Sequence, residues 1–501
     1  MRVVKCASLA SAIVVCSLVP VFGQTPPNGN LPAVSGRTQP ITSLGWYVMG
    51  SIGCAAVSPI IGTVILGREL TISEVYHTTL GCMLGPVGWL LADALFPPTV
   101  TGPNTRVGTQ SRKSRQVARG RHFTIPPPGD TRFVSNEMLF EFSNGASAQA
   151  RGALVRSLQL TQLEAQSFAL TGRTIERWRI DGTRTVRDTL RLVARNFPSV
   201  VSGQANGIYL CAQAQPTTKQ DAAADGGAAQ YVVRKLHLLE AHRISSGDDV
   251  LVAVIDSKID TGHPDLAGVI AAEYDAVGTP TPAHSHGTAI AGAIAAHSKL
   301  VGVAPKVKLL GARAFSGTAE SAQSTTFNIL KALDWAASKN ARIVNLSFAG
   351  PPDAMLREML IKANVQGIVL IAAVGNAGPR SAPLYPAADP GVIGVTATDA
   401  EDKLMPQASQ GPQVTVAAPG VEILAVAPGG GYQVTSGTSV AAAHASGVAA
   451  LLLAAKPNLT PAQVRSELMR SANRVPGKRN EVGAGVIDAL AVINPTRKEM
   501  G

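Results

Sequence analysis

The stretch "TSGTSVAAAHASG", residues 435–447, places four hydroxyl side chains within five positions and follows them with small residues and one histidine. Ser, Thr and Gly gather at helix N-termini, where their oxygens or bare backbone satisfy the first free N–H groups. A hydroxyl at the start of a helix can also serve as a nucleophile. The run 440–456, VAAAHASGVAALLLAAK, predicts a buried helix that packs closely through its small residues. The rest of the chain has to decide between a helix cap and a nucleophile.

The basic character of the chain belongs to its N-terminal half. The 501 residues are 46% apolar and 15% charged, which suits two or three folded domains, and the net charge is +11. Residues 229–501 carry 23 Lys and Arg against 21 Asp and Glu, so the first 228 residues supply +9 of that charge. The basic run 101–122 has no interleaved aromatic side chains. We therefore expect no nucleic-acid partner.

The N-terminus has the pattern of a secretory signal peptide over residues 1–23. Arg2 and Lys5 precede an apolar run that ends at the small residue Gly23. An uncleaved membrane anchor is the alternative. Both interpretations predict an exported protein, whether periplasmic, membrane-anchored or secreted.

Residues 43–97 form an apolar, glycine-rich segment that predicts a helical hairpin. Residues 43–67 contain no charge over 25 positions, which is long enough to cross a bilayer as a helix. Pro86 and Asp93 weaken the second span. We expect a membrane contact through 43–97, and a soluble pair of closely packed helices is the alternative.

Two compositional breaks separate a small domain from its neighbours. Residues 101–130 are basic and predict a flexible linker. Residues 131–213 alternate short strand patterns with two helical ones, which indicates a small α+β domain of the split βαβ type. Residues 214–230 are rich in Ala, Asp and Gly and predict a second linker.

The five cysteines all lie in the N-terminal half. The C-terminal half therefore has no thiol nucleophile and no disulfide framework. Cys6 and Cys16 fall in the leader. Cys54 and Cys82 could pair in an oxidising compartment or remain buried thiols, and the sequence leaves both open.

Residues 231–495 predict the largest domain. Near-continuous apolar strands alternate here with helical stretches, a pattern typical of a mostly parallel sheet covered by helices on both faces. The predicted fold class is therefore α/β, preceded by the small α+β domain and the apolar N-terminal hairpin. In such sheets functional groups collect at the carboxyl ends of the strands.

Three polar residues occupy such positions. Asp256 closes the strand VLVAVID, His286 precedes a Gly-Thr turn and a helix of small residues, and Asn376 follows the strand IVLIAAVG. Each has an ordinary structural explanation when taken alone. Together with the hydroxyls of 435–439, they give the chain order Asp, His, Ser of one type of catalytic triad.

The local strings around these residues resemble the subtilisin-like serine protease family. The resemblance runs in order over about 230–493 and rests on several independent motifs: VAVIDSKIDTGHPDL, HSHGTAIAGAIAA, VGVAPKVKLLGARAF, RIVNLSFAG, IAAVGNAGP, VAAPGVEILA, TSGTSVAAAHASGVAALLL and GAGVIDALAV. Residues 131–213 resemble the inhibitory propeptides of the same family through much weaker motifs.

The resemblance implies a serine endopeptidase and assigns its residues. Ser439 is then the nucleophile and its hydroxyl neighbours are turn or packing residues, His286 is the general base and acid, and Asp256 orients the imidazole. Asn376 and the backbone N–H of Ser439 would stabilise the oxyanion. The implied substrate-binding residues are Ser347, Phe348, Ala349 and Gly350 at a sheet edge, with Ala373 and Gly375 at the wall of a side-chain pocket.

The resemblance also implies the partners. These are peptide or protein substrates, with broad specificity, and the protein's own propeptide as an intramolecular inhibitor that is released by cleavage within 214–230. The chemistry needs no cofactor and no metal, and structural calcium sites are not assigned.

Three positions depart from the family pattern. Lys258 replaces the usual Gly two residues after Asp256, where it disturbs the turn if that position needs a positive φ, and otherwise points to solvent. Ala289 and Ala443 replace a His and a Pro, and we interpret both as packing variants. The rival hypothesis is a catalytically weak or inactive protein of this fold that binds peptides.

Overall fold

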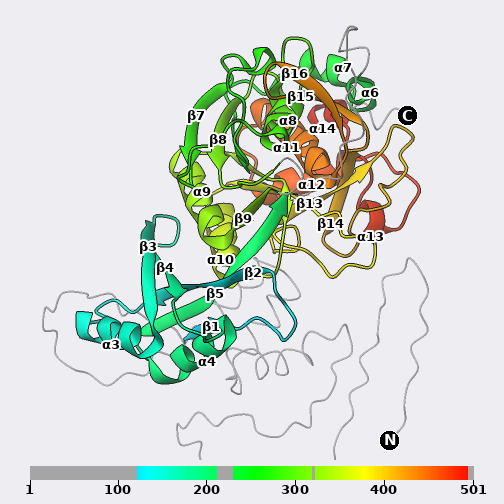
Figure 1. Cartoon of the computed structure of the whole chain (residues 1–501). Helices are drawn as coiled ribbons and strands as arrows, with labels where there is room; N and C mark the ends of the chain where they lie inside the picture. The colour runs from blue at the N-terminus through cyan, green and yellow to red at the C-terminus, as the bar shows by residue number, and fades with distance from the viewer. Residues whose placement is uncertain (1–120, 212–229, 319–321, 495–501) are drawn as a thin grey trace, which may run out of the picture. The chain divides into compact units, whose positions relative to one another are not determined.

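The computed structural model describes residues 121–211, 230–318 and 322–494 (Figure 1). Several predictions fall outside these ranges. They are the signal peptide 1–23, the hairpin 43–97, the linker up to residue 120, and nearly all of the linker 214–230.

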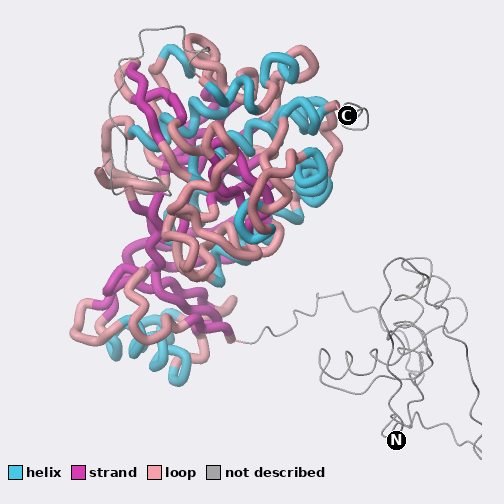
Figure 2. Tube along the Cα trace, turned by 90° about the vertical axis from the view of Figure 1, so that its right-hand side faces the viewer, coloured by secondary structure: helices cyan, strands magenta, loops and turns pink. Residues whose placement is uncertain are grey.

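The C-terminal part is built on a seven-stranded sheet in which every neighbouring pair is parallel. Figure 2 shows strands in magenta and helices in cyan in this part. Strands β10 and β6 are neighbours in the sheet although β7 and β8 lie between them in the sequence. The order of the strands in the sheet therefore differs from their order in the chain. In spatial order the strands are β14 (Val414–Pro419), β13 (Val392–Thr398), β12 (Val369–Ala373), β10 (Ile343–Leu346), β6 (Leu251–Asp256), β8 (Lys308–Arg313) and β7 (Ile270–Asp275).

Helices cover both faces of this sheet. Along β6, Val252 and Val254 pack into one core and Ala253 and Ile255 into the other, because successive strand residues point to opposite faces. The first face is covered by α8 (Ser285–Ala295) and α11 (Thr438–Ala455), and the second by α9 (Thr326–Ser338) and α10 (Ala354–Val365). The predicted α/β class with a parallel sheet is confirmed.

Shorter elements complete this part of the chain. Among the described residues, α11 alone is long and apolar enough to cross a bilayer, and 89% of its apolar window is buried inside the protein as a core helix. The remaining elements are α6 (Tyr231–Lys235), α7 (Leu238–His242), the 3-10 helix Pro264–Leu266, β9 (Gln323–Thr325), β11 (Phe348–Ala349), β15 (Ile423–Ala427), β16 (Gly431–Thr435), α12 (Pro461–Ser471), α13 (Arg479–Val482) and α14 (Ala489–Ile493).

Residues 121–211 form an α+β unit with its own core. Its sheet has the spatial order β1-β5-β2-β4-β3, antiparallel except for the β1–β5 pair. The elements are β1 (His122–Thr124), β2 (Phe133–Phe142), α3 (Ala148–Leu158), β3 (Leu160–Phe168), β4 (Arg173–Ile180), α4 (Val186–Asn196) and β5 (Val200–Cys211).

Two details of this unit differ from the sequence expectation. The sequence analysis predicted no strand at the position of β3, because LTQLEAQSF is mostly polar and only its two ends are buried. Residues 121–130, expected to be linker, lie in the structured unit: β1 pairs with β5, and Phe123 lies where a Cβ on Gly203 would come within 2.6 Å of its ring. A flexible linker can therefore include only the residues before them.

Strand β5 extends from the α+β sheet into the C-terminal part (Figure 1). Its last residues pair antiparallel with β9 on one side and with β11 on the other: Leu210 is opposite both Gln323 and Ala349, and Cys211 is opposite Phe348. The end of the α+β unit thus forms the middle strand of a three-stranded arrangement whose outer strands belong to the C-terminal part.

Side chains of β5 also cap helices of the C-terminal part. Asn206 Oδ1 accepts a hydrogen bond from the Phe327 N–H at the start of α9, at 3.2 Å. Gln204 Oε1 accepts one from the Met355 N–H at the start of α10, at 3.1 Å. Free N–H groups at a helix start need such acceptors. The two parts are therefore joined by polar caps as well as by strand pairing.

Candidate active site

Asp256 and His286 form a buried pair at the carboxyl end of β6. His286 Nδ1 lies 2.7 Å from Asp256 Oδ1, and the side chains are 3% and 1% exposed. Asp256 ends the strand, and His286 stands in the first turn of α8. The structure therefore brings together two of the residues that the sequence singled out.

Ser257 fixes the carboxylate, a role that the sequence did not reveal. Asp256 Oδ1 accepts hydrogen bonds from the Ser257 N–H at 2.7 Å and from its hydroxyl at 3.0 Å. The same hydroxyl accepts from the Gly287 N–H at 2.9 Å. A Cβ at residue 287 would lie 2.3 Å from the Ser257 carbonyl oxygen, so only glycine allows α8 this close to β6.

His284 anchors the start of the helix that carries His286. Its Nδ1 accepts the His286 N–H at 3.1 Å, so its Nε2 carries the proton and donates to the Thr318 carbonyl at 2.9 Å. His284 is the N-cap of α8. Nothing in the sequence distinguished this cap from an ordinary surface histidine.

Ser439 lies in the first turn of α11, and the N-cap residue of that helix carries no hydroxyl. The N-cap is Gly437, which has no side-chain hydrogen bond. Ser439 Oγ donates to the Ser347 carbonyl at 3.3 Å, and Ser347 Oγ donates to the Ser439 carbonyl at 2.9 Å. The helix cap interpretation therefore does not explain these hydroxyls.

Two further buried polar residues continue the hydrogen bonds from Ser347. Asn345 on β10 donates through Nδ2 to Ser347 Oγ at 2.7 Å. Ser446, two turns further along α11, donates its hydroxyl to Asn345 Oδ1 at 3.0 Å. All three side chains are fully buried, so each bond replaces contacts with water that burial removed. The sequence analysis missed both Asn345 and Ser446.

Asn376 is oriented by Thr438. Its Oδ1 accepts from the Thr438 N–H at 3.2 Å and from the Thr438 hydroxyl at 2.8 Å. The hydroxyl also accepts from the Gly375 N–H at 3.2 Å. Because Oδ1 is held by two donors, the NH₂ group of Asn376 is directed away from Thr438. Thr438, expected to be a turn or packing residue, instead positions the Asn376 loop.

The residues predicted to bind substrate lie in or next to β11 and at the end of β12. Phe348 and Ala349 form β11, the strand paired with β5. Ala373 ends β12 and is buried, and Gly375 has φ 97°, a conformation that favours glycine. A Cβ on Gly350 would come within 2.4 Å of the Tyr209 ring, so this glycine makes room for the aromatic side chain.

Tyr209 and Leu210 of β5 have opposite environments. Tyr209 is fully buried, packs edge-on against Phe348 and donates its hydroxyl to the Pro351 carbonyl at 3.2 Å. Burial raises the pKa of Tyr209 well above its usual range, so the phenol stays a neutral donor. Leu210 is 54% exposed.

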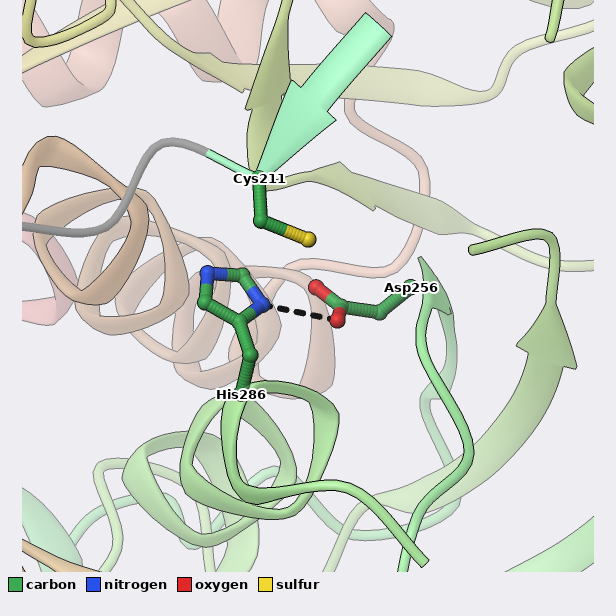
Figure 3. Close-up of side chains that lie close together, drawn as sticks. All are labelled: Cys211, Asp256 and His286. Atoms are coloured by element: carbon green, nitrogen blue, oxygen red, sulfur yellow. Dashed lines mark hydrogen bonds and ion pairs between the residues drawn. The ribbon is translucent and has the colours of Figure 1, made fainter. Parts of the chain in front are cut away.

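Cys211 lies beside the Asp256–His286 pair (Figure 3). One ligand atom from each of the three residues falls within 4.8 Å of the other two. Burial, and secondarily the charge of Asp256, raise the pKa of the Cys211 thiol well above its usual range. No sequence signal pointed to this thiol, because its position depends on the pairing of β5 with β9 and β11.

The three departures from the family pattern leave this geometry intact. Lys258 does not have a positive φ, is exposed, and donates from Nζ to the Thr281 carbonyl at 3.1 Å. The turn therefore tolerates a side chain at this position. Ala289 and Ala443 are buried among apolar neighbours of α8 and α11.

Comparisons with known proteins agree with this arrangement. The subtilase family profile matches residues 247–485. Subtilisin from Bacillus pumilus is 37% identical over 258 residues, which cover 49% of this chain and 91% of that protein. The chain belongs to the subtilase family. The sequence-based prediction of a family of serine-type endopeptidases is confirmed.

Other subtilases match over different shares of their length. Subtilisin E from Bacillus subtilis is 37% identical over 258 residues, 49% of this chain, and the match spans 66% of that protein. Thermitase from Thermoactinomyces vulgaris is 32% identical over 272 residues, 53% of this chain and 95% of thermitase. Fervidolysin from Fervidobacterium pennivorans, described as a keratinolytic enzyme related to subtilisin, has a similar structure, with a TM-score of 0.60 and 25% identity over 75% of this chain and 63% of fervidolysin.

Proposed function

We propose that this subtilase is an exported serine endopeptidase in which Ser439 attacks the peptide carbonyl and His286 takes its proton. The observation that carries the proposal is the buried 2.7 Å contact between His286 Nδ1 and Asp256 Oδ1. That contact fixes the proton on Nδ1 and leaves Nε2 with the lone pair that a general base needs.

The proton then follows a defined path. As the Ser439 oxygen bonds to the carbonyl carbon, its proton passes to His286 Nε2, and Asp256 stabilises the imidazolium that forms. The same proton passes to the leaving amine when the peptide bond breaks. The Asn376 amide and the Ser439 N–H would donate to the oxyanion between these steps.

The first substrate is proposed to be the chain itself. The described part of β5 ends at Cys211, which lies opposite Phe348, the residue after Ser347. Ser439 Oγ lies 3.3 Å from the Ser347 carbonyl oxygen. The carbonyl of Ala212 is therefore the one that an extended chain would present to the nucleophile. We expect cleavage of the Ala212–Gln213 bond, just ahead of the segment 214–230 that the sequence suggested.

Residues 131–213 are proposed to be an inhibitory propeptide. The pairing of β5 with both β9 and β11 supports this role, because a strand in that place excludes an added substrate strand. The domain would remain as an inhibitor after cleavage until its contacts are lost. The segment 43–97 would hold the precursor at a membrane.

Once the α+β domain has dissociated, the strand edges of β9 and β11 would accept peptides of many sequences. Main-chain pairing with β9 and β11 does not depend on side-chain identity. By analogy with Tyr209, the pocket beside Phe348 and Gly350 would favour an aromatic or large apolar side chain three residues before the residue whose carbonyl is attacked. In the alternative function, the protein would bind peptides along the same strands without hydrolysing them.

A fluorophosphonate probe with intact-mass analysis tests the proposal. The wild-type chain should split at Ala212–Gln213 and then label at Ser439. Ser439→Ala should remain one chain and take no label, with activity lower by about 10⁶-fold, the loss known for the corresponding serine in subtilisin. A wild-type chain that neither splits nor labels, even after residues 1–212 are removed by an added protease, would favour the inactive peptide-binding protein.

A further inference from the structure

Three side chains with metal-binding atoms meet where β5 ends. Cys211 comes from the end of β5, Asp256 from the end of β6 and His286 from the first turn of α8, with their ligand atoms within 4.8 Å of one another. Ligand atoms around a tetrahedral zinc ion stand about 3.3–3.8 Å apart, given bond lengths of about 2.0–2.3 Å. Small side-chain movements would close the difference.

The carboxylate supplies an atom that the proposed proton path does not use. Asp256 Oδ1 holds His286 and Ser257, whereas Oδ2 is buried and has no hydrogen-bond partner among the described residues. Figure 3 shows this second oxygen on the side of the Cys211 sulfur. A buried carboxylate oxygen without a donor is costly, and a cation would satisfy it.

We propose that Cys211, Asp256 and His286 form a zinc-type site in the precursor, with Sγ, Oδ2 and one imidazole nitrogen as ligands. A thiolate with an imidazole and a carboxylate selects a borderline or soft divalent ion over Mg²⁺ or Ca²⁺. The thiol proton leaves to solvent when the metal binds. A water molecule would complete four-coordination.

Such an ion would hold the precursor inactive. A neutral imidazole has one nitrogen lone pair, and a metal that takes it leaves His286 unable to accept the Ser439 proton. The ion would also tie β5 of the α+β domain to the catalytic part. Metal binding itself does not depend on the proposed function, whereas this effect on activity rests on it.

The test uses the full chain with Ser439→Ala, so that β5 stays attached whether or not the wild type is a protease. Metal-free protein is titrated with Co²⁺, followed by Zn²⁺. One equivalent of Co²⁺ should give a thiolate-to-metal absorption band in the near ultraviolet, and Zn²⁺ should remove it.

Matched variants identify the ligands. Cys211→Ser should abolish the band and His286→Ala should lower Co²⁺ affinity at least tenfold, whereas Cys54→Ser and Cys82→Ser should leave both unchanged. A band that survives Cys211→Ser, or no band at all, overturns the site. Thermal unfolding checks that each variant is folded.

A second measurement avoids substitution of the thiol. In the Ser439→Ala chain, Zn²⁺ should slow alkylation of Cys211 at least tenfold, as measured by peptide mass analysis, and equal rates with and without Zn²⁺ overturn the site. In the wild type, Zn²⁺ should slow self-cleavage at least tenfold. Metal binding without that delay would overturn the inhibitory role alone, and a wild type that never cleaves would count against the proposed function and not against the site.

Discussion

In the catalytic part the polar side chains around Ser439 bond to one another inside the core, whereas the α+β domain is joined to that part through β5, by helix caps, strand pairing and one buried aromatic ring. Asn345, Ser347 and Ser446 are fully buried and satisfied locally. Gln204 and Asn206 instead cap helices of the neighbouring part. The scaffold around Ser439 is thus held by bonds within the catalytic part, whereas the contact with the α+β domain depends on groups from both parts.

The largest effect on that contact should come from Tyr209→Ala. Removing this fully buried aromatic side chain should weaken binding of the α+β domain to the catalytic part by about 3–5 kcal/mol. After cleavage, the domain should dissociate at least a hundredfold faster, which appears as earlier probe labelling of Ser439.

Leu210→Ala is the matched control, because Leu210 neighbours Tyr209 and is largely exposed. It should leave the dissociation rate within about threefold. Equal rates for Tyr209→Ala and Leu210→Ala would mean that this binding does not depend on the buried ring.

Within the scaffold, Asn376→Ala should lower kcat by about 10²–10³-fold with little change in KM. The amide would act only when the oxyanion forms, so its loss should appear in kcat. Steady-state kinetics of the released catalytic domain on a peptide substrate measures the effect.

Thr438→Val tests the orientation of the Asn376 amide separately from the presence of that amide. It removes the hydroxyl that holds Asn376 Oδ1 and should cost about tenfold in kcat, less than loss of the amide. An unchanged kcat in Asn376→Ala would exclude this amide as an oxyanion donor.

The pH dependence of stability tests the core of the catalytic part as a whole. His444 is buried in α11, and burial lowers its pKa to about 4 while a hydrogen bond to the Pro419 carbonyl opposes the shift. Because the folded pKa lies below the unfolded value of 6.5, this contribution is complete above pH 6.5 and is lost as the pH falls toward 4. Its size is about 3 kcal/mol.

Urea unfolding of the Ser439→Ala chain between pH 7 and pH 4 checks the effect. The same chain with His444→Asn keeps a donor for Pro419 and has no group that titrates at this position. It should lose about 3 kcal/mol less over this range than the chain that keeps His444. Parallel pH profiles for the two chains would show that His444 is not held neutral.

The smallest effect is expected for Lys258→Gly, which restores the usual family residue. The ammonium group is exposed and bonds only one carbonyl, so kcat/KM should change by less than about threefold. A gain above tenfold would make Lys258 a cause of weak activity and would favour the inactive peptide-binding alternative for the native chain.

Short local patterns predicted the parallel sheet, whereas the Asp256–His286 pair was predicted from the chain order of its residues and from the family resemblance. Apolar runs predicted six strands of this sheet, whereas β7 alternates partly buried and exposed residues and has no such run. Polar residues at strand ends predicted the edge where they meet. Strand β3 escaped this reasoning because most of its side chains are only partly buried, which leaves no continuous apolar pattern.

The supporting groups could not be predicted, since their roles depend on pairs far apart in the chain. Asn345 accepts a hydrogen bond from Ser446, and Asn376 accepts one from Thr438. The sequence separation of the two residues does not identify either pair as a contact. The same holds for Cys211, which reaches Asp256 only because β5 pairs with β9 and β11.

The pairing of β5 with β11 also orders events during synthesis. The proposed cleavage bond emerges from the ribosome long before Ser439, and β11 and β9 are made between them. The α+β domain, whose core is its own, can fold early and then offer β5 as an edge on which those strands assemble. The proposed cleavage would then wait for α11 to be made and to pack, so a chain truncated before α11 would keep its α+β domain attached for its whole lifetime.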